Sequence, residues 1–254
     1  MLIDAHCHLN DEQFNSDIDA MISSAHDAGV KIIINAGTDL ASSRTAVKFA
    51  EQYKSIYAVV GIHPEHAASF DENALKAIRE LAQHRKVIGI GEIGLDFYWE
   101  NNPPRDVQEY ALNEQLDLAE ELNKPVVIHD RNAHDEIMNI IAQRNGKPCG
   151  MLHCFSGDLA MAQHAINLGW YVSFAGSVTF KNTKALQEIA RALPLDRIII
   201  ETDSPYLSPM RGKRNEPANV ALVAQKIAEL KEIPTSSVEQ ATMENTARLF
   251  GLEI

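Results

Sequence analysis

The chain opens with Leu2-Ile3-Asp4-Ala5-His6-Cys7-His8-Leu9, where an apolar pair leads into two histidines separated by one residue. If this stretch is a strand, its side chains alternate between the two faces, so both imidazoles lie on the same face. Two neutral imidazoles at the end of a strand suit a divalent metal ion. The alternative is a pair of surface histidines, and the rest of the chain is needed to choose.

Short apolar runs alternate with helix-length amphipathic segments along the whole sequence. The runs are rich in valine and isoleucine and predict eight buried parallel strands, at residues 2–8, 31–37, 56–64, 87–96, 125–130, 150–155, 170–176 and 197–205. Helical patterns occur at residues 17–28, 41–52, 72–83, 107–122, 134–144, 159–168, 183–193, 219–231 and 236–250. Alternating units imply right-handed crossovers, and eight of them in 254 residues predict an α/β fold of the TIM-type (β/α)8 barrel class.

The competing α/β fold is an open, doubly wound sheet, which would carry a glycine-rich phosphate loop after the first strand. This chain has His-Cys-His there, and it contains no Walker motif. No linker, repeat or low-complexity tract divides the sequence, so we predict one domain over residues 1–254. Two proline-containing loops, at 98–105 and 204–217, follow predicted strand ends, where barrel enzymes place functional loops.

The composition restricts the partners and the compartment. A net charge of −12 argues against broad electrostatic binding of nucleic acid, but it leaves room for an enzyme whose substrate phosphates meet metal ions and a few local cations. Three cysteines make no disulfide framework, and the first residues lack the pattern of a signal peptide. No apolar run approaches the ~18 residues of a membrane span. We expect a cytoplasmic protein with no membrane association and no obligate protein partner.

Side chains able to bind a metal recur where the apolar runs end. Six of them come from five predicted strands and are His6, His8, Glu92, His129, His153 and Asp203. A barrel brings the carboxyl ends of its strands to one mouth, and so these side chains into one pocket. Four imidazoles and two carboxylates exceed the needs of one tetrahedral ion, whereas two ions ~3.5–4 Å apart with a bridging carboxylate fit better. Glu92 is the predicted bridge, because its strand faces the first strand across the barrel.

The same stretches carry a resemblance. The matching segments lie at residues 3–9, 61–64, 91–98, 128–129 and 153–157, with Glu-Thr-Asp-Ser-Pro-Tyr-Leu at 201–207, Arg-Gly-Lys-Arg-Asn-Glu-Pro at 211–217 and Asn-x-x-Arg-Leu-Phe at 245–250. Over its whole length the chain resembles the TatD family of metal-dependent deoxyribonucleases, within the amidohydrolase-like metal barrels. The resemblance implies a TIM-type barrel, the same six residues as metal ligands, and hydrolysis of DNA phosphodiester bonds.

Further polar residues near the predicted mouth are candidates for substrate contact, namely His63, Arg131, Arg211, Lys213 and Arg214. His63 would contact a phosphate or a metal-bound water, or else cap a loop. Arg131 would bind a phosphate oxygen, or else be a solvated start of the next helix. A basic cluster of Arg211, Lys213 and Arg214 lies on the loop after the last strand, a usual phosphate-binding position in this fold. The alternative is a solvated loop, and the position favours substrate contact.

Two pairs of neighbours are expected to support the ligands. Asp4 and Glu201 share face parity with His6 and Asp203 and could orient ligand imidazoles, the alternative being interior carboxylates satisfied by other polar groups. Cys7 and Cys154 each adjoin a ligand histidine, so alternation predicts that both thiols point away from the metals into the core.

Two enzymatic functions fit these residues. The first is a metal-dependent hydrolase that cleaves DNA or oligonucleotides, with Glu92 and Asp203 as catalytic residues and Asp203 also accepting the proton of the attacking water. The second is an amidohydrolase or lactonase that acts on a small molecule with the same metals. Many such barrels bridge their metals with a lysine on the fourth strand, where this chain has Glu92. The predicted cofactors are divalent ions, two per subunit, with Mg²⁺, Mn²⁺ and Zn²⁺ all left open.

Overall fold

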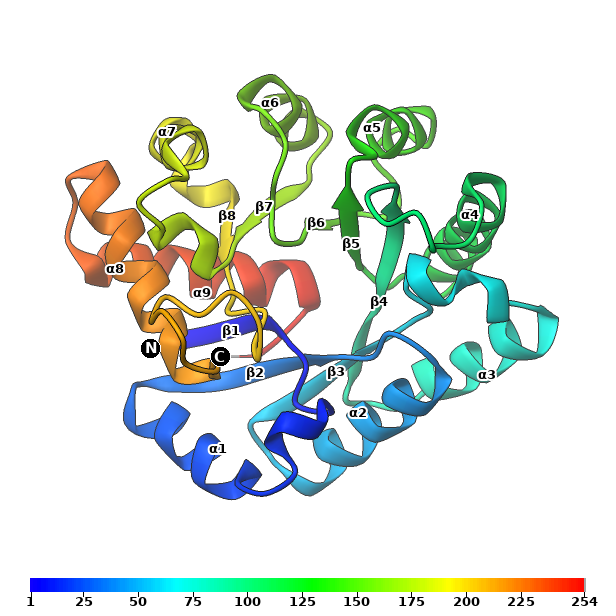
Figure 1. Cartoon of the computed structure of the whole chain (residues 1–254), viewed down its shortest axis with the longest axis horizontal. Coiled ribbons are helices and arrows are strands. Elements are labelled where there is room, and N and C mark those ends of the chain that lie inside the picture. The colour runs from blue at the N-terminus through cyan, green and yellow to red at the C-terminus, as the bar shows by residue number, and fades with distance from the viewer. Residues whose placement is uncertain (254) are drawn as a thin grey trace.

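The strands follow one another around a barrel in the order of the sequence (Figure 1). The computed structural model describes residues 1–253, and each strand pairs in parallel with the next. The strands are β1 (Leu2–Cys7), β2 (Val30–Ala36), β3 (Ile56–Val60), β4 (Val87–Asp96), β5 (Val126–Arg131), β6 (Gly150–Leu152), β7 (Tyr171–Phe174) and β8 (Ile198–Ile200). The predicted (β/α)8 barrel is confirmed.

The barrel closes between β8 and β1 through a short seam that lies just beyond the end of β8. The backbone N–H of Asp203 donates to the carbonyl oxygen of His6 at 3.0 Å, and the N–H of His8 donates to the carbonyl oxygen of Ser204 at 2.8 Å. Closure therefore places Asp203 beside the two histidines of the opening strand.

In the described residues 1–253, eight α-helices cover the outside of the strands, and a ninth lies across one end. They are α1 (Ile18–Asp27), α2 (Leu40–Gln52), α3 (Glu72–Ala82), α4 (Arg105–Glu121), α5 (His134–Gln143), α6 (Leu159–Asn167), α7 (Lys184–Ala192), α8 (Val220–Lys231) and α9 (Thr235–Phe250). Asp39, Asp71 and Asp158 accept hydrogen bonds from backbone N–H groups in the first turns of α2, α3 and α6, which fixes where these helices begin. Within residues 1–253, none of the helices has the length and apolarity needed to cross a bilayer.

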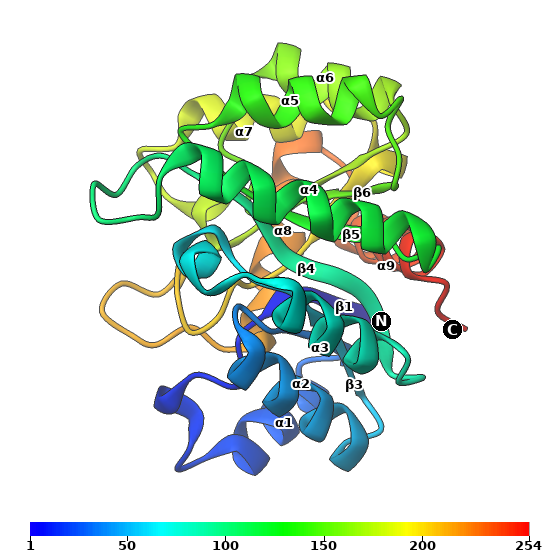
Figure 2. The same ribbon diagram turned by 90° about the vertical axis from the view of Figure 1, so that its right-hand side faces the viewer.

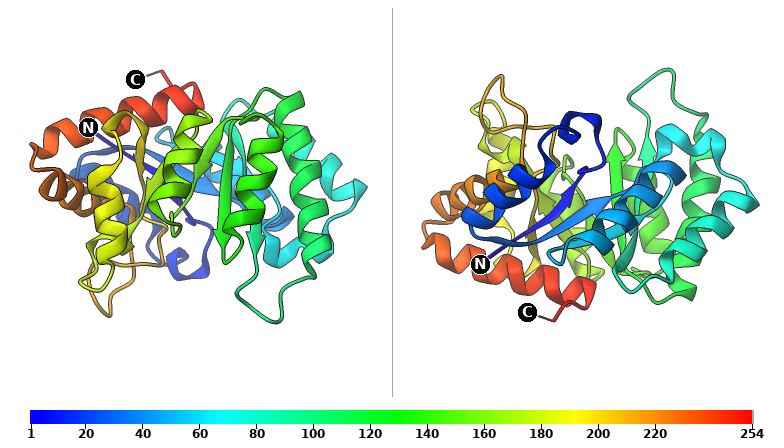
Figure 3. Two further views of the ribbon diagram at one scale, coloured as in Figure 1. Left: turned by 90° about the horizontal axis from the view of Figure 1, so that it is seen from above. Right: turned by 90° about the horizontal axis from the view of Figure 1, so that it is seen from below.

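The apolar core has two layers. The larger layer packs between the strands and the surrounding helices. The smaller one fills the barrel with inward residues such as Ile34, Val59 and Ile199, and Phe250 of α9 joins it. Figure 3 shows α9 at the end of the barrel opposite the long loops that follow β4 and β8. One mouth is thus closed by apolar packing, which leaves the mouth at the carboxyl ends of the strands for polar side chains.

The last three strands are shorter than the sequence predicts, and the difference matters for the site. β6 ends at Leu152 and β8 ends at Ile200, so His153 and Asp203 lie in the segments that follow. Cys154 and Asp203 adopt left-handed backbone conformations, with φ of 42° and 57°. Strict alternation fails in such segments. Cys7 is buried as predicted, whereas the prediction for Cys154 is wrong, because that residue lines a cavity.

Candidate metal centre

Glu92 stands between two groups of imidazoles. Its Oε2 atom lies 3.3 Å from Nε2 of His6 and 3.5 Å from Nε2 of His8. Its Oε1 atom faces three other rings, at 3.5 Å from Nε2 of His63, 2.9 Å from Nδ1 of His129 and 3.4 Å from Nε2 of His153. The carboxylate thus presents one oxygen to each group, which is the arrangement expected of a bridging ligand.

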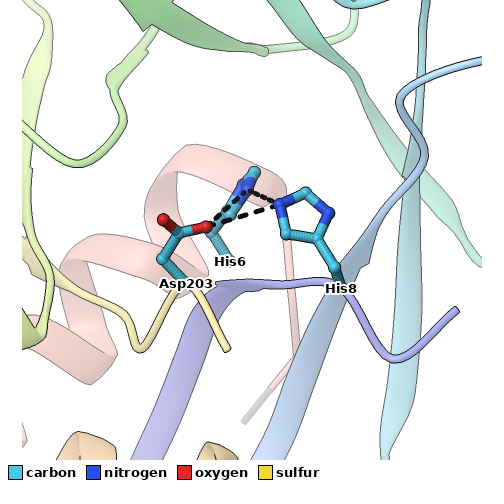
Figure 4. A group of neighbouring side chains, drawn as sticks. All are labelled: His6, His8 and Asp203. Carbon is cyan, nitrogen blue, oxygen red and sulfur yellow. Dashed lines mark hydrogen bonds and ion pairs between the residues drawn. The ribbon is translucent and has the colours of Figure 1, made fainter. Parts of the chain in front are cut away.

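Asp203 completes the group around His6 and His8 (Figure 4). Its Oδ1 atom lies 3.4 Å from Nε2 of His8 and 3.8 Å from Nε2 of His6, and the two nitrogens are 3.2 Å apart. Bonds of about 2.1 Å to one tetrahedral ion would separate its donor atoms by about 3.4 Å. The spacing and the chemistry of these donors therefore fit a divalent cation.

Two further carboxylates contact the imidazoles of the second group. Oε1 of Glu201 lies 2.7 Å from Nδ1 of His153, so the predicted orienting role of Glu201 matches the geometry. Oδ2 of Asp96 lies 3.1 Å from Nε2 of His129, a contact that was not among the predictions from the sequence. Carboxylates in these positions fix the orientation of a ligand ring and raise its basicity. The signal for Asp96 was available, since it lies four residues after Glu92 on the same face of β4.

Asp4 has a different task. Its carboxylate accepts hydrogen bonds from the backbone N–H of Thr202 at 2.8 Å and from the hydroxyl of that residue at 2.6 Å. It therefore holds the segment that leads into Asp203. The sequence allows two roles for Asp4, and the structure shows an interior carboxylate satisfied by polar groups rather than one that orients an imidazole.

Burial and charge act against each other in the centre. Burial raises the pKa of the Glu92 carboxyl, but His153, His63, His129 and His6 outweigh it, and the pKa lies well below its usual value. Burial lowers the pKa of His129, yet hydrogen bonds with Asp96 and Glu92 raise it to about 9. The pKa of His153 rises to about 10 because Glu201 and Glu92 overcome the same burial. In the metal-free centre, protons on these rings would balance the carboxylates, and a bound cation would serve the same purpose.

His63 has the capping role that was the alternative for it, and its ring also faces the metal centre. Its Nδ1 atom accepts a hydrogen bond at 3.2 Å from the backbone N–H of Glu65, which caps the short 3-10 helix Pro64–Ser69. The cap directs Nε2 of the same ring toward Glu92. His63 is therefore placed with the donor groups, and a contact with substrate stays a prediction.

The basic cluster after β8 is not one surface. Arg214 donates to the two carboxylate oxygens of Asp17 at 3.0 and 2.6 Å and to Glu216 at 3.0 Å, and its guanidinium lies 4.5 Å from the centre of the Phe14 ring. These contacts engage Arg214 within its own chain and argue against the predicted phosphate contact. Arg211 and Lys213 are exposed and lie outside the residues that line the cavity, so their contact with substrate stays a prediction.

A cavity of about 710 Å³ opens above Glu92 at the mouth of the barrel. Its lining includes the carboxylates of Asp11, Glu65, Glu92, Asp96, Asp130 and Asp203. Arg131 is the one arginine or lysine among its lining residues within the described part of the chain. Trp99 and Tyr206 also line it, and about half of each side chain is exposed. An anion would enter this acidic cavity only with the help of cations.

A parallel eight-stranded barrel with a histidine and carboxylate centre at its open mouth defines the class of metal-dependent hydrolase barrels. The model of the family described as TatD related DNase matches residues 3–251. The chain belongs to the TatD family.

Relatives across the whole length support this assignment. The chain is 41% identical to the metal-dependent hydrolase YabD of Bacillus subtilis, with 99% of this chain and 100% of YabD covered. It is 36% identical to the metal-dependent hydrolase YcfH of Escherichia coli, with 99% and 96% covered. The crystal structure of YjjV, a TatD homologue from Escherichia coli, superposes with a TM-score of 0.94 at 31% identity and covers 99% of this chain and 98% of YjjV. The chain is thus a metal-dependent hydrolase of the TatD family.

Proposed function

We propose that this protein hydrolyses phosphodiester bonds in DNA with two divalent ions per subunit. The observation that carries the proposal is the position of Glu92, which presents one oxygen to each of two donor groups. Paired ions that share a carboxylate are a recurrent arrangement in enzymes that cleave phosphate esters. The description of the matching family as TatD related DNase names the same chemistry.

The donors divide between two positions. His6, His8 and Asp203 would hold one ion. Glu92 forms a second possible donor group with His63 and His129, and it also groups with His6 and His153. When bound, the two ions would polarise the phosphate and activate the attacking water. His153 and His129 keep their orientation through Glu201 and Asp96.

Asp203 is the candidate for accepting the proton. Burial raises its pKa, but contacts with His8, His153 and His6 outweigh burial and lower it, so the carboxylate is ionised near neutral pH. One oxygen faces the imidazoles, and Figure 4 shows the other pointing away from both rings. That second oxygen is available to a water in the cavity that Asp203 lines.

The experiment is the release of nucleotides from a short single-stranded DNA oligonucleotide. Protein treated with EDTA should be inactive, and Mg²⁺, Mn²⁺ or Zn²⁺ added singly should restore activity. A parallel assay with lactone and amide substrates tests the amidohydrolase or lactonase alternative. Metal-restored turnover of those substrates alone would overturn the nuclease proposal, and full DNA cleavage in a rigorously metal-free sample would overturn the metal mechanism.

A further inference from the structure

Two half-exposed aromatic side chains flank the cavity from different loops. Trp99 lies on the loop between β4 and α4 and is 50% exposed, and Tyr206 lies on the loop after β8 and is 52% exposed. Figure 2 shows these two loops projecting from the same end of the barrel. Exposed aromatic side chains that gather at the mouth of a cavity often mark a binding site. A ligand with an apolar surface would remove water from both rings when it enters the cavity.

The loop that bears Trp99 is held by hydrogen bonds to Asp96, a residue that also contacts the candidate ligand His129. Asp96 accepts a hydrogen bond at 2.9 Å from the backbone N–H of Tyr98 through Oδ1, while its Oδ2 atom contacts His129. The carbonyl oxygen of Asp96 also accepts from Asn102 at 3.1 Å and from Gln108 at 3.0 Å. One residue therefore links the orientation of a candidate ligand ring to the position of the aromatic loop.

The immediate neighbours of Trp99 hold its ring and leave much of it exposed. Tyr98 meets it edge to face, with ring centres 4.7 Å apart and an angle of 85° between the planes. The guanidinium of Arg131 lies 4.0 Å from the centre of the Tyr98 ring and 5.2 Å from the centre of the Trp99 ring. An aromatic surface and a cation thus stand together at the rim, as recognition of a base joined to a phosphate requires.

We propose that Trp99 binds the substrate directly, as the surface on which a nucleobase next to the cleaved phosphodiester stacks. The inference rests on the nuclease function proposed above. It adds that the enzyme selects substrates by the presence of a base beside the cleaved bond. A purine or pyrimidine offers a flat π surface to the indole whatever its identity, so stacking gives affinity without sequence preference. Arg131 beside the ring is placed to meet a phosphate oxygen. Substrates that lack the base should therefore bind less well, although the bond to be cleaved is the same.

The kinetic test compares a thymidine oligonucleotide with the same oligonucleotide carrying an abasic residue at its terminal position. In the wild type, kcat/KM should be about 5- to 150-fold lower for the abasic substrate, from the usual strength of base stacking on aromatic side chains. Trp99→Ala should lower kcat/KM for the intact substrate by a similar factor, mainly through KM, and should change the abasic substrate little. Trp99→Phe should recover much of the loss.

Tyr110→Ala is the matched control, because Tyr110 is 54% exposed on α4 and does not line the cavity. It should behave as the wild type with both substrates. Equal loss for both substrates in Trp99→Ala, or no loss for either, would overturn the inference while DNA cleavage by the wild type still supports the nuclease function. Failure of the wild type to cleave either oligonucleotide would instead overturn the nuclease function.

Binding can be read directly from tryptophan fluorescence. The chain has two tryptophans, and Trp170 is only 1% exposed, so a change on ligand binding reports on Trp99. Thymidine 5′-monophosphate added to the metal-loaded protein should quench the emission, and deoxyribose 5-phosphate should not. Trp99→Phe should abolish the quenching. Equal quenching by both compounds in the wild type would overturn stacking.

Discussion

At the scale of single residues, Glu92 is the donor with the most neighbours in the centre, because its carboxylate faces every other candidate donor except Asp203. Glu92→Gln keeps the shape of the side chain but removes the charge that offsets the cations. We expect a lower metal content per protein and a large loss of activity, with the fold retained. Elemental analysis of protein purified without chelator, together with circular dichroism, measures both.

Glu65→Gln is the control for that substitution, because Glu65 also lines the cavity but belongs to none of the candidate donor groups. It should keep the metal content of the wild type. A Glu92→Gln protein with normal metal content and a normal rate would show that Glu92 is not a ligand.

Asp203 allows metal binding to be separated from proton transfer. Asp203→Asn keeps the size and one oxygen donor but cannot accept a proton, and loss of a general base typically costs ~10²–10⁴ in rate. We expect kcat to fall by about that factor while KM changes little and most metal stays bound. Near-normal kcat would remove the assignment as base, and loss of metal would leave Asp203 as a ligand only.

The residues of the centre differ in how far the sequence predicts them. The six predicted ligands were recognisable because each is a polar side chain in the second half of an apolar run or directly at its end, and barrel topology brings these parts of the strands together. Asp96 follows from the same alternation, because it lies four residues after Glu92 on the same face of β4. The stacking of Arg131 over Tyr98 and the pairing of Arg214 with Asp17 depend on loop conformations, which no periodicity encodes.

At the scale of elements, the loop after β8 is tied to the segment before α1. Arg214 pairs with Asp17 and also donates to the backbone carbonyl of Gln13, and the Tyr206 hydroxyl donates to Asp11 at 3.0 Å. Both segments lead directly from candidate ligands, His8 on one side and Asp203 on the other. The loops therefore support the geometry of one donor group from outside the barrel.

Arg214→Ala should consequently lower the melting temperature and weaken metal binding, whereas Lys213→Ala, its exposed neighbour on the same loop, should do neither. Arg214 lowers the pKa of Asp17, so this contribution to stability is present above the ordinary pKa of an aspartate and is lost as pH falls below it. The difference in melting temperature between the wild type and Arg214→Ala should shrink in acid. A difference independent of pH would exclude the ion pair as its cause.

The elements also show where sequence patterns stop. Apolar runs located all eight strands, but they predicted β3, β6, β7 and β8 to be longer than they are. Buried residues that follow the last hydrogen bond between strands are as apolar as those within the strand, so the pattern does not show where pairing ends. The left-handed conformation of Asp203 gives no apolar signal at all. The position of the centre in the barrel was therefore predictable from the sequence. The orientation of side chains that follow the strand ends, such as Asp203, was not.

At the scale of the whole molecule, the net charge of −12 and the acidic cavity oppose the approach of DNA. Bound cations at the mouth would reverse the local sign while leaving the rest of the surface negative. Affinity for oligonucleotides should then depend strongly on metal and only weakly on salt, in contrast to proteins that neutralise many phosphates with lysine and arginine. Fluorescence anisotropy of a labelled oligonucleotide, titrated with and without metal over a range of salt, tests this. A steep salt dependence would point to an extended basic footprint instead.

The last prediction concerns protons, because the metal-free centre holds them on His129 and His153. Their pKa values of about 9 and 10 lie above the ~6.5 of an unfolded chain. In EDTA-treated protein their contribution to stability is thus fully present below about pH 6.5 and is lost as pH rises through 9 to 10.

A metal ion needs neutral imidazoles, so metal binding at pH 8 should release roughly two protons, one from each ring. Calorimetry in buffers of different ionisation enthalpy counts them, and Glu201→Gln, which removes a carboxylate that holds the proton on His153, should reduce the count. The release should fall toward zero above pH 10, where the rings have already lost their protons. Binding without proton release at pH 8 would mean that these imidazoles are neutral before metal arrives, and that the charge of Glu92 is balanced by other groups.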